Sequence, residues 1–349
     1  MEKMRLGRTG LLIGRSGFGA LPIQRISIND SVHILRKAYH NGFDFFDTAR
    51  NYSDSEEKIG AALSDVRHDV VLATKSSAEN KDDLLKDLEI SLKNLRTDYV
   101  DILQLHNPSK VPDPLDPQSS LAGAMEARKR GMVRYVGFTN HSLENAIKAA
   151  RSDIYDTIQF PLSILSTNDE FRLVDECLKN DCGLIAMKAM GGGLITNTAA
   201  AFAFLRQYEN VVPVWGIQRE EELDQFLELE RNPPVLDENL RDLIRKDQRE
   251  LSFQFCRGCG YCMPCPQGIQ INMTARMSLL LRRAPSQNFL TPEWREKMLL
   301  INQCSDCGHC RSRCPYGIDT PELLRENLRN YLEFSKPEVC SSGDVKGLK

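Results

Sequence analysis

Eight of the eleven cysteines in this chain of 349 residues are concentrated in two short runs. The second run has the spacing C-x2-C-x2-C-x3-C-P, and the first run is one residue shorter before its last cysteine. Four thiolates at the spacing of the second run are typical of an iron–sulfur cluster site. The runs are Cys256, Cys259, Cys262 and Cys265, and Cys304, Cys307, Cys310 and Cys314.

Zinc binding and disulfide formation are the two alternatives for these cysteines. Zinc sites usually pair two C-x2-C hooks over a longer gap, whereas the first run places four cysteines within ten residues. The N-terminal segment MEKMRLGRTG lacks the apolar core of a secretory signal, so we expect a cytoplasmic protein. Disulfides are rare in that compartment. Both runs therefore favour iron–sulfur clusters.

A second set of reactive side chains follows short apolar runs in the first half of the chain. Asp47, Lys75 and His106 each end such a run, and Tyr52 lies just beyond the first of them. Alone, the aspartate could cap a helix, the lysine could be solvated, and the histidine could be a satisfied buried residue. As a set, a lysine lowers the pKa of a tyrosine from its usual value of about 10, and an aspartate orients that lysine. With a histidine to direct the substrate, such a group can protonate a carbonyl oxygen while hydride reaches the carbon.

Residues 1–235 consist of eight apolar runs, each followed by a stretch with helical periodicity. Buried strands that alternate with amphipathic helices indicate a parallel sheet, and eight units favour a closed (β/α)8 barrel. An open doubly wound sheet ranks second, because the glycines of GRSGFGA lack the spacing of a dinucleotide-binding turn. The C-terminal ends of barrel strands meet at one mouth, where the reactive side chains would converge. The runs are 14–21, 43–47, 69–75, 99–106, 133–140, 155–160, 183–190 and 211–217.

The balance of acidic and basic residues argues against two classes of binding partner, nucleic acids and anionic membranes. Lys and Arg number 45 against 48 Asp and Glu, which gives a net charge of −3. A chain so close to neutral has no electrostatic signature of nucleic-acid or anionic-membrane binding. No apolar run approaches the about 18 residues of a membrane-spanning helix. We therefore expect a small-molecule substrate, and neither a nucleic acid nor a membrane as partner.

The first unit contains five motifs in order: DFFDTARNYSDSEEKIG, VVLATKSS, DYVDILQLHN, VRYVGFTNH and IAMKAMGGG. With these motifs, essentially all of residues 1–235 resembles the aldo-keto reductase family. The resemblance implies a barrel that binds a reduced nicotinamide cofactor in extended form and has no metal in its active site. It also implies that Asp47, Tyr52, Lys75 and His106 form a catalytic tetrad with Tyr52 as proton donor.

The same resemblance assigns residues to the cofactor. Asn140 and Gln159 match the positions that hold the nicotinamide carboxamide. Two features depart from the family: QFPLSIL has no aromatic residue soon after the Gln except Phe160, and WGIQREEEL lacks a basic run for a 2′-phosphate. A carboxylate at Glu222 tolerates a ribose diol better than a phosphate, so NADP and NAD both stay open. The remaining matched residues are Gly19, Ala20, Lys188 in the turn 187–193, and Gly216, Gln218, Arg219 and Glu222 in the turn 216–222.

Residues 236–335 resemble a small α-helical ferredoxin-like domain, and residues 336–349 are expected to form a flexible tail. In two-run ferredoxins the last cysteine of each run serves the other cluster. The resemblance therefore implies two [4Fe–4S] clusters with exchanged fourth ligands. The expected sets are Cys256, Cys259, Cys262 and Cys314, and Cys304, Cys307, Cys310 and Cys265.

Two functions follow from these features. The first is an NAD(P)H-dependent oxidoreductase that reduces an aldehyde or ketone, with clusters that exchange electrons with a redox partner or brace the fold. The alternative is an electron-transfer or redox-sensing protein whose barrel serves as a nucleotide-binding element. The intact tetrad favours the enzyme.

Overall fold

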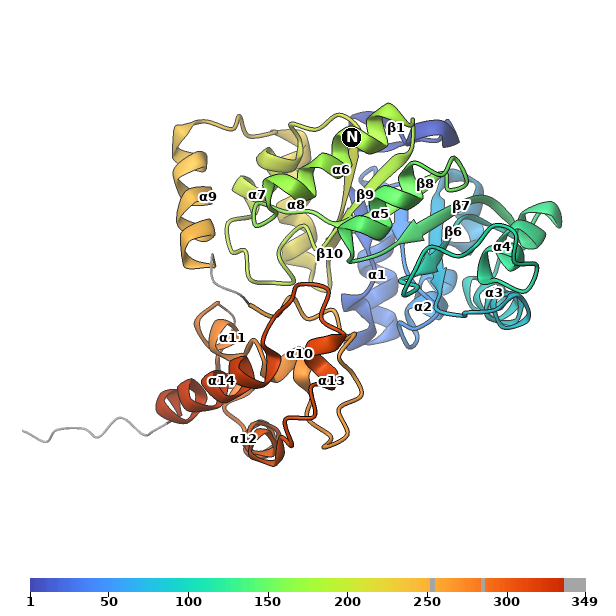
Figure 1. Ribbon diagram of the computed structural model, residues 1–349. Helices are drawn as coiled ribbons and strands as arrows, with labels where there is room; N and C mark the ends of the chain where they lie inside the picture. The colour runs from blue at the N-terminus through green and yellow to red at the C-terminus, as the bar shows by residue number, and fades with distance from the viewer. Residues whose placement is uncertain (252–254, 284–285, 336–349) are drawn as a thin grey trace, which may run out of the picture. The chain divides into compact units, whose positions relative to one another are not determined.

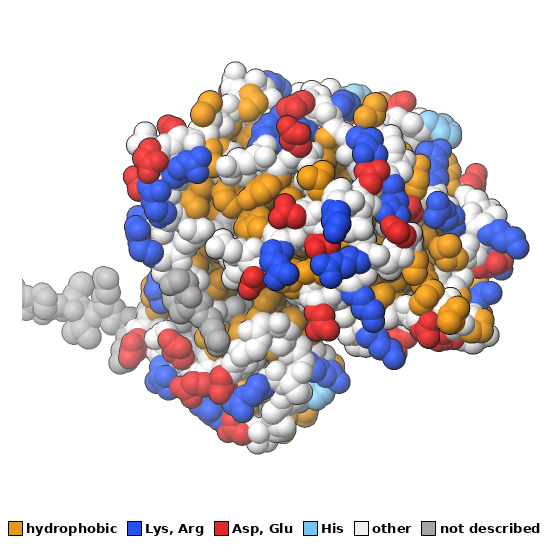
Figure 2. All heavy atoms as spheres, turned by 45° about the horizontal axis from the view of Figure 1, so that its top comes forward, with side chains coloured by type: hydrophobic (Ala, Val, Ile, Leu, Met, Phe, Trp, Pro, Cys, Tyr) orange, Lys and Arg blue, Asp and Glu red, His pale blue; other side chains and the backbone are white. Residues whose placement is uncertain are grey.

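The computed structural model describes residues 1–251, 255–283 and 286–335. The expected tail at 336–349, with Cys340, lies outside the described residues. Contacts divide the chain into two units, Met1–Ser252 and Phe253–Lys349, and each is described by itself. No helix within the described residues is both long and apolar enough to cross a membrane. On the face shown in Figure 2, Lys and Arg side chains are interspersed with Asp and Glu side chains.

Within the described residues, the first unit contains a closed barrel of eight parallel strands, as the sequence predicts. Each strand pairs with the next along the chain, and β10 pairs with β3 to close the barrel (Figure 1). The strands are β3 (Gly17–Gly19), β4 (Phe45–Asp47), β5 (Val71–Ser76), β6 (Val100–His106), β7 (Val133–Thr139), β8 (Thr157–Pro161), β9 (Gly183–Met187) and β10 (Val211–Gly216).

Helices follow the strands and surround the barrel (Figure 1). Several begin at a side chain that accepts a hydrogen bond from a backbone N–H of the first turn, as Ser27, Asn80 and Ser119 do. Thr167 and Glu170 form a reciprocal capping box. The helices are α1 (Ile28–His40), α2 (Ser55–Leu63), α3 (Lys81–Leu95), α4 (Ser120–Lys129), α5 (Leu143–Ala150), α6 (Asn168–Lys179), α7 (Thr198–Leu205) and α8 (Glu220–Arg231).

A short hairpin closes the N-terminal end of the barrel interior. β1 (Lys3–Arg5) and β2 (Leu12–Gly14) pair in antiparallel fashion. Leu6 and Ile13 of this segment are fully buried against Phe45 and Ile102 from the barrel strands. The hairpin therefore leaves the opposite, C-terminal end of the strands as the mouth at which chemistry can take place.

Helix α9 (Glu238–Glu250) belongs to the barrel unit by its contacts. It packs against α7, where Ile244 is buried beside Ile164 and Ile195. The boundary expected after residue 235 precedes this helix, whereas the division between the units follows it. The sequence could not reveal this assignment, because α9 presents few apolar residues and is mostly exposed.

The second unit is a small α-helical fold around its cysteines. Its core contains Met277, Leu280, Leu328 and Tyr331, and it includes Cys310 from the second cysteine run. Asn327 is buried and ties the last helix to the Ala275 carbonyl through a hydrogen bond of 3.1 Å. The helices are α10 (Ile271–Thr274), α11 (Met277–Arg283), α12 (Pro292–Leu299), α13 (His309–Ser312) and α14 (Thr320–Phe334).

Candidate active site and candidate cluster sites

Three of the four proposed tetrad residues lie at the C-terminal ends of consecutive barrel strands. Asp47 ends β4, Lys75 is the penultimate residue of β5, and His106 ends β6. These strands pair side by side, so their ends share one edge of the mouth. Tyr52 follows in the segment between β4 and α2 and is partly buried. The structure brings all four side chains together.

A buried ion pair forms the base of this site. Lys75 Nζ lies 2.7 Å from Asp47 Oδ2, and the two side chains are 2% and 6% exposed. The ammonium group also donates to the Thr48 carbonyl at 2.5 Å. Gln104 Nε2 donates to the other carboxylate oxygen, Asp47 Oδ1, at 2.9 Å. These additional hydrogen bonds offset part of the cost of removing two charges from water.

Tyr52 stands over this pair. Lys75 Nζ lies 5.2 Å from the centroid of the tyrosine ring, and the His106 ring lies 6.0 Å from it at an angle of 81°. Burial raises the pKa of Tyr52 above its ordinary value, while the Lys75 ammonium lowers it and the Asp47 carboxylate raises it. The lysine thus acts in the expected direction, but burial outweighs it. The phenol is therefore protonated at neutral pH and has a proton to donate.

His106 has different electrostatics. Burial, together with the Lys75 ammonium, lowers the pKa of His106 to about 3. Its Nδ1 atom is buried and has no hydrogen-bond partner within the described residues. At neutral pH the ring is uncharged, so it can direct a carbonyl group by hydrogen bonding but has no excess proton to transfer. Of the two rings, only Tyr52 suits the role of acid.

A buried carboxylate, Glu56, holds the segment that carries Tyr52. Thr74 Oγ1 donates to Glu56 Oε1 at 2.7 Å, and Arg50 Nη1 donates to Oε2 at 2.9 Å. The Arg50 backbone N–H donates to the Lys75 carbonyl at 2.9 Å. The tyrosine is therefore flanked by anchored residues on both sides. Sequence reasoning missed Glu56 because in a helical stretch it looks like a solvated residue.

Asn140 directly follows β7 and lies beside Gln159 of β8, where the Asn140 backbone N–H donates to the Gln159 carbonyl at 3.1 Å. Gln159 Oε1 is buried and has no partner within the described residues, so it is available to an amide donor such as a carboxamide. Asn140 already donates to the Pro108 carbonyl and accepts from the Ser142 N–H, each at 2.8 Å. Gln159 is therefore the better fitted of the two to receive a cofactor.

The aromatic residue beside Gln159 does not face the interior of the barrel. Successive residues of a strand point to opposite sides. Phe160 is 1% exposed and belongs to the core that includes Ile158 and Leu184 from the barrel strands and Phe226 from helix α8. The structure therefore agrees with the departure seen in the sequence: Phe160 packs in the core and does not present an aromatic ring at the mouth of the barrel.

The residues expected to contact the cofactor lie where the backbone is closely packed or has a positive φ. At Gly19, a Cβ atom would lie 3.0 Å from the Trp215 carbonyl oxygen, so a side chain there would be tight against β10. Ala20 is fully buried, and its N–H donates to the Asp47 carbonyl. Lys188, the first residue after β9, has a φ of 56°, and the glycines that follow also have positive φ.

Arg219 and Glu222 pair with one another in the turn before and the first turn of α8. Glu222 Oε1 accepts from Arg219 Nη2 at 2.7 Å and from Nε at 3.0 Å. Glu222 Oε2 accepts from the backbone N–H of Gln218 at 2.9 Å and of Arg219 at 3.2 Å. The carboxylate therefore both caps the helix and neutralises Arg219, which the sequence analysis considered for a 2′-phosphate. Gly216, at the end of β10, is exposed beside this turn.

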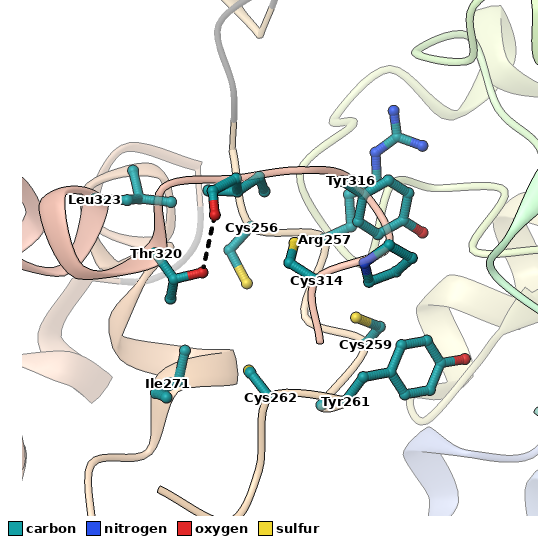
Figure 3. A pocket seen from close by; sticks show the side chains of 13 residues that line it. Cys256, Arg257, Cys259, Tyr261, Cys262, Ile271, Cys314, Tyr316, Thr320 and Leu323 are labelled. Carbon is teal, nitrogen blue, oxygen red and sulfur yellow. Dashed lines mark hydrogen bonds between the residues drawn. The ribbon is translucent and has the colours of Figure 1, made fainter. Parts of the chain in front are cut away.

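In the second unit, the first three cysteines of run one and the last cysteine of run two surround one cavity. The empty space amounts to about 360 Å³, part of it open to solvent. Figure 3 shows the four sulfur atoms directed towards a common space. Cys256, Cys259, Cys262 and Cys314 line the cavity together with Ile271 and Leu323. This is the ligand set that the ferredoxin resemblance implies.

The other four cysteines line a second cavity of about 370 Å³. Cys265 joins Cys304, Cys307 and Cys310 there, and Cys262 and Ile271 form part of the wall of both cavities. Within the parts of the chain that the structure describes, no three ligand-type side chains converge on a point suited to a single metal ion. The thiols surround a space instead, as the ligands of a polynuclear cluster do.

Burial raises the pKa of one thiol in the first cysteine run, and two ion pairs anchor the second run. Burial, with further contributions from neighbouring thiols, raises the pKa of Cys262 to about 12. Because cluster ligands are thiolates, iron binding there must displace a proton. Arg325 pairs with Asp306, and Arg311 pairs with Asp319 at 2.6 Å, which ties the second run to the last helix and its N-terminal cap.

Two family profiles match the chain. Residues 11–203 match the aldo/keto reductase family, and residues 255–319 match a 4Fe-4S dicluster domain. Aldo-keto reductase YhdN of Bacillus subtilis is 29% identical over 216 residues, which cover 56% of this chain and 64% of that protein. Methylglyoxal reductase DkgB of Salmonella typhi is 36% identical over 137 residues, or 37% of this chain and 51% of that protein. These matches span about half to two thirds of each relative.

Solved structures share the barrel. The thermostable aldo-keto reductase Tm1743, in complex with the inhibitor epalrestat, is 27% identical with a TM-score of 0.60, covering 71% of this chain and 100% of that one. An aldo-keto reductase from Klebsiella pneumoniae in complex with NADPH has a TM-score of 0.61 at 22% identity, covering 71% and 95%. At this identity, the similarity to the Klebsiella pneumoniae structure shows a shared fold only.

Proposed function

The chain belongs to the aldo/keto reductase family and carries a 4Fe-4S dicluster domain, and from this premise we propose that it reduces the carbonyl group of an aldehyde or ketone with a nicotinamide cofactor. The observation that supports this most strongly is the buried Lys75–Asp47 pair beneath a protonated Tyr52 and a neutral His106.

The proposed reaction assigns one task to each member of this tetrad. A nicotinamide cofactor, held at the mouth by the residues described below, would supply hydride to the carbonyl carbon. Tyr52 donates its hydroxyl proton to the carbonyl oxygen, so that an alcohol forms, and His106 orients that oxygen by a hydrogen bond. Lys75 stabilises the phenolate that results, and Asp47 keeps the ammonium group in place.

Several residues at the mouth would hold the cofactor. Gln159, whose buried Oε1 lacks a partner within the described chain, would accept from the carboxamide, with Asn140 beside it. Gly19 and Ala20 would allow close approach at the end of β3. Lys188 and the turn with Gly216, Gln218, Arg219 and Glu222 would face the pyrophosphate and adenosine portions.

We further propose that the second unit holds two [4Fe–4S] clusters, one in each cysteine-lined cavity. Such clusters transfer single electrons, whereas hydride carries two, so the clusters would serve a separate redox partner or brace the fold rather than take part in hydride transfer. We also propose a cytoplasmic location, because disulfide formation in an oxidising compartment would remove these thiols as cluster ligands. The complete set of eight cysteines likewise supports the alternative, an electron-transfer or redox-sensing protein.

Anaerobic assays with NADPH and with NADH test this function. Purified protein would be mixed with a panel of aldehydes and ketones while nucleotide oxidation, cluster absorbance and electron paramagnetic resonance are followed. The expected result is carbonyl-dependent oxidation of one nucleotide per alcohol formed. Cluster reduction by nucleotide, with no carbonyl reduced across the panel, would contradict the enzyme and support the alternative.

Replacement of Glu222 by Gln is expected to shift cofactor preference towards NADPH. The amide can still cap α8, but it no longer neutralises Arg219 or repels a 2′-phosphate. The gain is expected to be about fivefold in the NADPH to NADH ratio of kcat/KM, which corresponds to roughly 1 kcal/mol for an exposed charge pair.

Glu221→Gln is the matched control, because it removes the same charge from the exposed neighbouring position. An equal shift in both variants, or none in Glu222→Gln, would contradict the role given to the Arg219–Glu222 pair.

A further inference from the structure

Gln104 contacts the tetrad without being one of its members. It lies on β6, it is fully buried, and its Nε2 atom donates to Asp47 Oδ1 at 2.9 Å. Lys75 Nζ donates to the other carboxylate oxygen at 2.7 Å. Lys75 and Gln104 are directly paired across β5 and β6. Each oxygen of the Asp47 carboxylate is therefore held by a different strand.

Burial of the Gln104 amide at this position lowers the stability of the fold. Gln104 Oε1 is buried and has no hydrogen-bond partner within the described residues. A buried carbonyl oxygen without a partner destabilises the fold, and such a group in a native structure needs an explanation. Methionine would fill a similar volume without any polar atom to satisfy. Packing alone therefore does not account for glutamine at this position.

Gly137 provides the space that the amide needs. Gln104, Gly137 and Thr157 are paired in register across β6, β7 and β8, so they form one layer of the barrel. A Cβ atom at residue 137 would lie 2.9 Å from Gln104 Cγ and 2.5 Å from Thr157 Oγ1, which is closer than real contacts allow. A side chain at position 137 would displace the Gln104 side chain, which could then no longer reach the Asp47 carboxylate.

We propose that Gln104 is a positioning residue that orients the Asp47 carboxylate and, through it, holds Lys75 against the Tyr52 ring. The titratable groups that face this set are Asp47 from β4, Lys75 from β5, His106 from β6, and Tyr52 itself. Without the amide donor, one oxygen of Asp47 is released and the carboxylate can rotate. The inference rests on the proposed function, because the position of Lys75 matters through proton donation by Tyr52.

The variant Gln104→Met removes the donor at similar volume. Its kcat for carbonyl reduction is expected to fall about tenfold, the rate equivalent of one lost hydrogen bond to a charged group. The KM values for nucleotide and carbonyl are expected to change by less than about twofold, because Gln104 is buried beneath Asp47 and is not among the residues proposed to hold either of them. Thr157→Val is the matched control: it removes another buried polar group from the same layer, and its kcat is expected to match that of the parent.

A second measurement does not depend on turnover. In protein labelled with nitrogen-15 at glutamine, the Gln104 side-chain amide signal is the one that Gln104→Met lacks. Lys75→Met is expected to move this signal, because Asp47 links the two side chains, whereas Lys37→Met on α1 is not. An unmoved signal, or a Gln104→Met kcat within about twofold of the parent, overturns the inference. Failure of the parent protein to reduce any carbonyl contradicts the proposed function instead, and the amide signal still tests the positioning role.

Discussion

Replacement of Tyr52 by Phe is expected to lower kcat for carbonyl reduction by about a hundred- to ten-thousand-fold, the range that general acid catalysis contributes. Phenylalanine keeps the ring beside Lys75 and His106 but has no proton to donate. His106 cannot take over, because its pKa of about 3 leaves it uncharged at neutral pH. Steady-state kinetics, with nucleotide affinity from fluorescence titration, measures the effect, and affinity is expected to change little.

Tyr39→Phe is the control for this experiment. Tyr39 lies on α1, where its hydroxyl donates to Asp69 at 3.0 Å in an exposed hydrogen bond that involves none of the four tetrad residues. Parental kinetics are expected in that variant. Turnover close to the parental rate in Tyr52→Phe would show that another group supplies the proton, and the proposed tetrad would have to be abandoned.

Replacement of Cys307 by Ser is expected to remove one of two clusters, so that iron falls from about eight atoms per chain to about four. Cys307 is the exposed member of its set, so the substitution alone disturbs little packing. Cluster loss should nevertheless destabilise the second unit, because Leu324 and Ile269 belong both to its core and to the cavity wall. Since metal binding in small domains contributes about 10 kcal/mol or more of folding free energy, the loss should amount to several kcal/mol.

Iron and sulfide analysis of anaerobically prepared protein, together with thermal unfolding, measures both effects. Cys340→Ser is the control, since that cysteine stands apart from both runs in the sequence. The barrel has its own core and its unfolding transition is expected to stay in place. Stoichiometric zinc with almost no sulfide in the parent protein would refute the cluster assignment for both cysteine runs.

The alternation of apolar runs with helical stretches was enough to predict the barrel. Buried parallel strands are continuous apolar runs, and the rules for connecting successive strand–helix units allow few sheet topologies. It also predicted that Asp47, Lys75 and His106 meet, since strand ends of a barrel share one mouth. The cysteine spacing carried its own geometric information, and the two cavities group the eight thiols as the ferredoxin resemblance implies.

Other features depend on burial and tertiary contacts, which a sequence does not display. The raised pKa of Tyr52 results from burial that outweighs Lys75, and the sequence shows only the lysine. Glu56 was hidden in a helical stretch. Gln104 left one signal, a polar residue inside the apolar strand DILQLH, but its target became apparent only when Asp47 proved to lie within hydrogen-bond distance.

The pairing of β3 with β10 also bears on how the protein matures. β3 can pair with β10 only after the ribosome has synthesised all eight strands. Trp215 then donates a hydrogen bond to Ser16 where these two strands meet. The cysteine runs follow β10 in the chain, and domains tend to fold in order of synthesis. Iron and sulfide would thus be inserted into a nascent chain whose barrel has already closed. An expression host short of iron should therefore yield a folded barrel joined to an immature second unit.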